Sequence, residues 1–152
     1  MISSARCAIG ADDTGPLTDA VLADLARRGI PAQRFGALRA EPRPAGDPSD
    51  GWASVGRAVG EAVARGDATF GIVCCWTGTG VSIAANKVRG VRAALCADAA
   101  TAEGARRWND ANVLALSMRA TTPAVAGEIL AAFLRAEVSR EPGDTREIES
   151  AE

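Results

Sequence analysis

The chain has 152 residues, a formal net charge of −2, 47% hydrophobic residues and 24% charged residues. This length and composition fit one globular domain with a continuous core. The near-neutral charge argues against a nucleic-acid partner, and no apolar run approaches the ~20 residues that cross a bilayer. Since the N-terminus also lacks the layout of a signal peptide, we expect no membrane partner and a cytoplasmic location.

The sequence contains no histidine and no tyrosine, which removes the commonest general base, the commonest metal ligand and the phenolic acid. The cysteines lie in or beside apolar runs, without the spacing of a zinc site or a secreted disulfide framework. Most of them are therefore expected in the core, and no metal or cofactor is expected. The four are Cys7, Cys74, Cys75 and Cys96.

In chain order, alternating short apolar runs and helical periodicities predict strands that alternate with helices. This alternation predicts an α/β fold with a mainly parallel, doubly wound sheet and helices on both faces. We expect one domain over residues 1–138 and a polar tail over 139–152, where Pro142-Gly143 stops the preceding helix. The expected strands are 1–10, 30–35, 69–75, 91–96 and 112–116; the expected helices are 16–29, 52–64, 81–87, 99–108 and 122–138; an irregular loop, 36–51, is a candidate for specificity.

In parallel sheets the ligand site lies beyond the carboxyl ends of the strands, so loops 10–15 and 75–82 should converge. The segment 75–82 ends a strand and opens a helix, which directs backbone N–H groups and the positive helix end toward an anion. At this place the thiolate of Cys75 would be favoured, and Cys75 is a candidate base. The alternative is that the glycines serve only a tight strand-to-helix turn.

Three segments together resemble the ribose-5-phosphate isomerase B and galactose-6-phosphate isomerase family over residues 5 to about 138. The resemblance implies a Rossmann-like α/β/α sandwich with a five-stranded parallel sheet, in a dimer or tetramer with active sites between subunits. It also implies metal-free chemistry on a small sugar or sugar-like substrate. The segments are Gly10-Ala11-Asp12, the run from Cys75 to Lys87 followed by residues 90–94, and Asn109 to Leu116.

The resemblance also implies roles for individual residues. Cys75 would move a proton between C1 and C2 through a cis-enediolate, while Thr77 and the loop N–H groups hold the oxyanion. Asp12 and Asn109 would orient sugar hydroxyls. The loop residues expected to bind substrate are Gly78, Thr79, Gly80 and Ser82, and Arg119 and Arg146 are expected to grip a phosphate.

Several site residues depart from the family pattern. Asp13 and Trp108 replace two family histidines, one that helps bind phosphate and one that opens the sugar ring, and Trp76 replaces a small glycine. A carboxylate repels phosphate, and indole cannot relay a proton. Trp76 and Trp108 are expected to line one pocket, and the usual loop tyrosine is absent, with Trp52 near its place. Each change also has a structural alternative, in which Asp13 caps a helix and the tryptophans pack.

Three functions follow from these observations. The first is an aldose–ketose isomerase that acts on a sugar phosphate or on a linear or modified sugar. The second is a repurposed enzyme for an unphosphorylated, more apolar metabolite of a biosynthetic pathway. The third is a non-catalytic subunit of a hetero-oligomeric isomerase.

Overall fold

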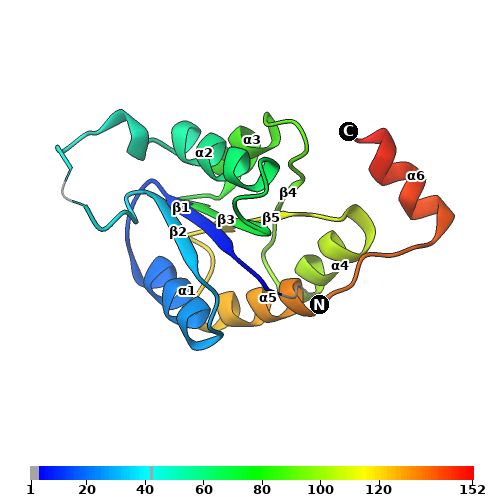
Figure 1. The fold of residues 1–152 in the computed structure, drawn as a ribbon. Coiled ribbons are helices and arrows are strands. Elements are labelled where there is room, and N and C mark those ends of the chain that lie inside the picture. Colours follow the sequence, from blue (N-terminus) through cyan, green and yellow to red (C-terminus); the bar gives the residue numbers. More distant parts are fainter. Residues whose placement is uncertain (1–3, 42) are drawn as a thin grey trace.

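The computed structural model describes residues 4–41 and 43–152. Its centre is a five-stranded parallel sheet with the strand order β2-β1-β3-β5-β4 (Figure 1). The predicted α/β class and parallel sheet are therefore confirmed. The strands are β1 (Cys7–Ala11), β2 (Ala32–Gly36), β3 (Phe70–Cys75), β4 (Ala93–Leu95) and β5 (Val113–Ser117).

Helices cover both faces of the sheet (Figure 1). One layer contains α2 and α3, which pack against each other, and the other contains α1, α5 and α4. A 3-10 turn, η1 (Pro48–Asp50), lies in the long loop between β2 and α2. The helices are α1 (Pro16–Arg27), α2 (Trp52–Ala64), α3 (Thr79–Asn86), α4 (Ala99–Asn109), α5 (Pro123–Arg135) and α6 (Pro142–Ser150).

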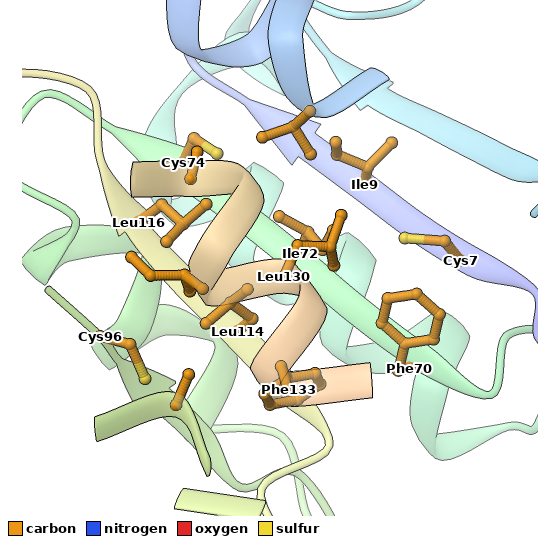
Figure 2. Close-up of a cluster of buried hydrophobic side chains, with 14 of the residues drawn as sticks. Cys7, Ile9, Phe70, Ile72, Cys74, Cys96, Leu114, Leu116, Leu130 and Phe133 are labelled. Carbon is orange, nitrogen blue, oxygen red and sulfur yellow. The ribbon is translucent and has the colours of Figure 1, made fainter. Parts of the chain in front are cut away.

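The core has two parts, one on each face of the sheet. Figure 2 shows the part beneath α5, where Phe70 and Phe133 face each other with ring centroids 6.3 Å apart. The other part lies beneath α2 and α3 and is built from small and β-branched side chains, including Val55, Val59 and Val73. Strand β3 is buried on both faces, which explains its unbroken apolar sequence.

The element boundaries differ from expectation mainly at the ends. Helix α3 begins at Thr79 rather than at residue 81, because Gly78 adopts a left-handed conformation and starts the helix two residues earlier. The strand expected over 91–96 is reduced to Ala93–Leu95 at the edge of the sheet. The strand expected over 1–10 begins at Cys7, and residues 1–3 lie outside the described part.

The polar tail contains a further helix, α6, which begins at Pro142 and has no buried residue. Pro142-Gly143 does not stop the preceding helix, because α5 already ends at Arg135; proline in the first turn suits a helix start, and Pro142 begins α6. Helix α6 projects away from the sheet and contacts α4 (Figure 1). Within the described ranges, no helix combines the length and the apolar character that crossing a lipid bilayer requires.

Candidate functional site

The carboxyl ends of β1 and β3 lie side by side at the centre of the sheet. The chain continues from β1 to β2 on one side and from β3 toward β4 on the other, so the order of the strands reverses between them. Such a reversal point is where open parallel sheets bind ligands. Ala11 pairs with Cys74, so the next residues, Asp12 after β1 and Cys75 at the end of β3, lie beside each other. The predicted convergence of loops 10–15 and 75–82 is confirmed.

The adjacent cysteines Cys74 and Cys75 face opposite layers. Cys74 belongs to the core beneath α1 and α5, and burial raises the pKa of its thiol to about 12. Cys75 belongs to the core beneath α2 and α3, and it is the last residue of β3, with 5% of its surface exposed. Among the four cysteines, all of them buried, Cys75 therefore has the position from which a sulfur can reach the loop beyond the sheet.

The loop after Cys75 opens helix α3 at a tight turn. Gly78 has φ +75°, and a Cβ atom on it would be 2.5 Å from Leu95 Cδ1 and 2.9 Å from the carbonyl carbon of Leu116. Only glycine fits this place without strain. Within the described chain, no partner is recorded for the backbone N–H groups of residues 77–81, which are the unpaired donors of a helix start. They are available to an oxyanion.

Polar and aromatic side chains surround this loop. The hydroxyl oxygens of Thr77 and Thr79 are 2.6 Å apart, and both residues are exposed. The indole ring of Trp52, the first residue of α2, lies against Gly80. Ser82 lies one turn into α3, and its amide donates to the carbonyl of Gly78. The structure thus brings together the predicted residues of the loop and adds Trp52 beside them.

Asp12 and Asp13 border a hollow of about 450 Å³ next to the loop. Burial raises the pKa of the Asp12 carboxyl; a hydrogen bond from its own backbone acts in the opposite direction, and the charge of Asp13 raises it further. The Asp13 carboxylate accepts a hydrogen bond from the amide of Thr14 at 2.8 Å. It does not cap α1, whose N-cap is Gly15, so the capping alternative for Asp13 is wrong.

Trp76 also lines this hollow, and 64% of its surface is exposed. Its carbonyl is held by the Arg119 amide at 2.9 Å and by the Ser117 hydroxyl at 3.0 Å, which fixes the backbone of the loop against the end of β5. Arg119 itself lies in the turn after β5 with an exposed side chain. The indole of Trp76 therefore projects over the hollow rather than into the core.

Three predicted site residues lie elsewhere in the chain. Trp108 and Asn109 end α4 and line a separate hollow of about 590 Å³ between α4, β4 and α6. Arg146 lies on α6 with an exposed side chain. Trp76 and Trp108 thus line different hollows within one chain, and their expected shared pocket, which the resemblance would place between subunits, stays a prediction. The two lie apart because α4 ends where β5 begins, at the opposite end of the strands from Cys75.

Two residues of the site were not predicted from the sequence. Met118 lines the hollow beside Trp76, and Ser117 holds the Trp76 carbonyl. Both follow directly after the buried part of β5, so their position at a strand end was the only signal. In the described part of the chain, no group of three or more Cys, Asp or Glu side chains is placed to hold a metal ion.

Comparison with known proteins places this geometry in context. Residues 7–150 match the family model described as Ribose/Galactose Isomerase. The chain is similar to galactose-6-phosphate isomerase subunit LacB of Clostridium acetobutylicum, with 44% identity over 81 residues, 53% of this chain and 47% of that protein. It is also similar to ribose-5-P isomerase B of Listeria innocua, with 31% identity over 135 residues, 88% of this chain and 86% of that protein. The match spans about half the length of the first curated relatives.

The structural similarity extends over nearly the whole chain. The type B ribose 5-phosphate isomerase of Trypanosoma brucei superimposes with a TM-score of 0.83 and 39% sequence identity, over 97% of this chain and 96% of that chain. The five-stranded parallel sheet with its flanking helices is therefore a fold of the type B ribose 5-phosphate isomerase kind. The chain belongs to the ribose/galactose isomerase family.

Proposed function

We propose that the protein is an aldose–ketose isomerase in which Cys75 is the acid–base group. The observation that carries this proposal is the position of Cys75 at the carboxyl end of β3, directly before a loop whose backbone N–H groups at residues 77–81 have no recorded partner among the described residues. Asp12 leaves the neighbouring strand beside it, where a carboxylate can orient a sugar hydroxyl. The family contains sugar-phosphate isomerases, which supports the same reaction class.

The reaction begins on an open-chain substrate. The Cys75 thiolate removes the proton from the carbon next to the carbonyl, and the electrons of that C–H bond form the carbon–carbon double bond of an enediolate. The negative oxygen faces the N–H groups of residues 78–80. The Thr77 and Thr79 hydroxyls, 2.6 Å apart, pass a proton between the two substrate oxygens. The thiol then returns its proton to the neighbouring carbon, and no redox change occurs.

Substrate in the ring form is a poor starting point for this site. The chain has no histidine, and the indole of Trp108 is a hydrogen-bond donor that cannot relay a proton. We therefore expect the enzyme to act on the small open-chain fraction of a pentose and on all of a sugar too short to form a stable ring. A short-chain ketose should be used faster than a pentose of the same charge.

We also propose that a second subunit completes the site. Asn109 and Trp108 lie at the opposite end of the strands from Cys75, and their side chains are exposed. In an isologous dimer, Asn109 and Trp108 of one subunit can lie beside Cys75 of the other, although they lie at opposite ends of the strands within one chain. Exposed apolar residues near β4, including Ile83 and Leu95, provide a surface that such a contact would bury.

Proton exchange tests the chemistry. The protein is incubated with free and phosphorylated tetroses and pentoses in deuterated water, and deuterium at the carbon next to the carbonyl is followed by NMR. Cys75→Ala should abolish exchange, whereas Cys74→Ala, which removes a neighbouring sulfur on the opposite face, should retain it. Equal exchange by the parent and Cys75→Ala would refute the assignment of Cys75, and an absence of exchange with every sugar would refute the isomerase.

Complementation tests the shared site. Cys75→Ala and Asn109→Ala are each expected to be inactive as pure proteins. When the two are unfolded together and refolded as a mixture, the hybrid dimer carries one intact site, so activity should reappear. A mixture as inactive as its components would show that Asn109 does not act across a subunit boundary.

A second candidate function rests on the similarity to LacB, which is named as a subunit of galactose-6-phosphate isomerase. On this hypothesis the chain supplies part of a site in a complex with an unlike homologous chain. Co-purification of a histidine-containing homologue, with activity only in the mixture, would favour it. A purified homo-oligomer with full exchange activity would exclude it.

A further inference from the structure

The hollow beside the Cys75 loop has a negative lining. It encloses about 450 Å³ and is bordered by the carboxylates of Asp12 and Asp13. No arginine or lysine is among its lining residues in the described chain. Among the lining residues of this chain, a phosphate would face two acidic groups and no cation, which is unfavourable at short range.

The start of helix α1 borders the hollow but offers few free amides. The Thr14 amide is bonded to the Asp13 carboxylate at 2.8 Å, and the Gly15 amide is bonded to the Thr18 hydroxyl at 2.9 Å. Pro16, the first residue of α1, has no N–H group. At these three residues two amides are therefore occupied and the third donor is missing, so fewer donors are left here to hold an anion.

Part of the lining is apolar. Trp76 is exposed to 64% and lines the hollow together with Met118 and Leu17. A flat apolar ring together with carboxylate oxygens, which only accept hydrogen bonds, suits a molecule with C–H surface and hydroxyl donors. A neutral sugar chain has both.

We propose that this hollow selects an unphosphorylated sugar and that Asp13 and Trp76 determine that specificity. The inference rests on the proposed isomerase function, since the hollow adjoins the Cys75 loop through Trp76. Asp13 repels a phosphorylated end and occupies the Thr14 amide that would otherwise bind it. Trp76 packs against the carbon chain of the sugar, and Asp12 accepts hydrogen bonds from its hydroxyls.

A binding experiment tests the charge preference without turnover. Cys75→Ala protein is titrated at low salt with D-erythrulose and with its 4-phosphate, and tryptophan fluorescence is recorded. The free sugar should bind at least about tenfold more tightly, the scale expected of repulsion between nearby charges. Added salt should reduce the difference, because screening weakens this repulsion.

Two aspartates on the same segment provide a matched comparison. Asp13→Asn removes the charge and leaves an oxygen that can accept from Thr14, so the preference should fall by about tenfold. Asp19→Asn removes an exposed charge from the first turn of α1, outside the lining, and should leave the preference unchanged. Trp76→Ala should weaken binding of the free sugar. Thermal unfolding of each variant verifies that it folds.

The outcomes separate the two proposals. Tighter binding of the phosphate ester than of the free sugar, or an Asp13→Asn protein with an unchanged preference, would overturn the charge assignment even if Cys75 is catalytic. Loss of all exchange activity with the binding preference intact would refute the isomerase and leave the specificity of the hollow standing. A preference for an amino sugar above both would show that the carboxylates select a cation instead.

Discussion

The indole ring of Trp52 lies so close to Gly80 that a Cβ atom on Gly80 would be 2.8 Å from ring atoms Cδ2 and Cε3. Trp52 opens α2 and Gly80 is the second residue of α3, so the contact joins the starts of two helices that pack along their length. It also places an aromatic surface over the glycine loop. The absence of a side chain at Gly80 is therefore a packing requirement of the site.

Gly80→Ala should destabilise the protein by about 1–3 kcal/mol, since the new methyl group must displace the ring. In a Trp52→Ala protein, the same change should instead be neutral or stabilising by up to about 1 kcal/mol, because alanine is the better helix former. Urea unfolding of the two single variants and the double variant measures this coupling. Additive effects would contradict the contact.

Gly78→Ala is expected to be more damaging than Gly66→Ala. Both glycines have a left-handed backbone, with φ of +75° and +80°, but a Cβ on Gly78 would meet Leu95 and Leu116 whereas nothing lies within 4 Å of Gly66. The strain of a positive φ costs both variants about 1 kcal/mol or more, and the clash adds to it only at Gly78. Unfolding free energies of the two proteins check the difference. Equal losses would show that the loop can move aside.

Thiol reactivity should distinguish Cys75 from the other cysteines. Burial raises the pKa of Cys96 to about 11 and that of Cys74 to about 12, and it raises the pKa of Cys7 as well. Thiols that stay protonated react slowly. Cys75 lies at the end of β3 beside the loop, so iodoacetamide should label it before these three in native protein at mildly alkaline pH, as mass spectrometry of the peptides would show. Labelling of Cys7 or Cys74 before Cys75 would contradict this order, and urea should make all four react.

The stability should depend on pH through Asp12 in a defined direction. Burial raises the Asp12 pKa in the folded chain. The protonated Asp12 carboxyl therefore contributes to folding stability below the ordinary carboxyl pKa of about 3.9, and this contribution is lost as pH rises through the raised pKa. Relative to Asp12→Asn, the parent should lose stability over that interval. Denaturant unfolding of both proteins across the acid range measures it, and a constant difference would contradict the shift.

Asp98 provides the opposite case. Hydrogen bonds from the Thr101 amide lower its pKa at the start of α4, so the stabilisation is present above the ordinary carboxyl pKa and disappears as pH falls through the lowered value. The parent should therefore gain stability over Asp98→Asn as pH rises. If the stability difference between parent and variant changed with pH in the same direction for Asp12→Asn and Asp98→Asn, a general charge effect would be indicated instead.

The order and type of the elements could be predicted from the sequence because the strands are short apolar runs and the helices have regular spacing. The start of α3 was missed because Gly78 begins the helix with a left-handed residue, a choice set by contacts with Leu95 and Leu116. The shortening of β4 was also missed. There the Asn86 side chain bonds with both backbone groups of Ala93, a contact between a helix and the next strand that hydrophobic periodicity does not reveal.

The part of the candidate site that follows from strand ends was predictable, whereas the separation of Trp76 and Trp108 within one chain depends on topology. The loops after β1 and β3 meet as expected, since parallel neighbours end at the same edge. Trp108 and Trp76 were expected together because both replace residues of one site in the family, but helix α4 runs back to the opposite end of the strands before β5. The resemblance to the family indicates which residues belong to one site, but it does not say which subunit supplies each of them.

The opposite orientation of Cys74 and Cys75 has a consequence for how this chain can vary. Successive side chains of a strand point to alternate faces, so a deletion of one residue before Cys74 in β3 would turn each sulfur to the other face of the sheet. The thiol meant for chemistry would then be sealed beneath α1 and α5, and Trp76 would take its place at the end of the strand. Strand β3 is therefore constrained in its length as well as in its buried side chains.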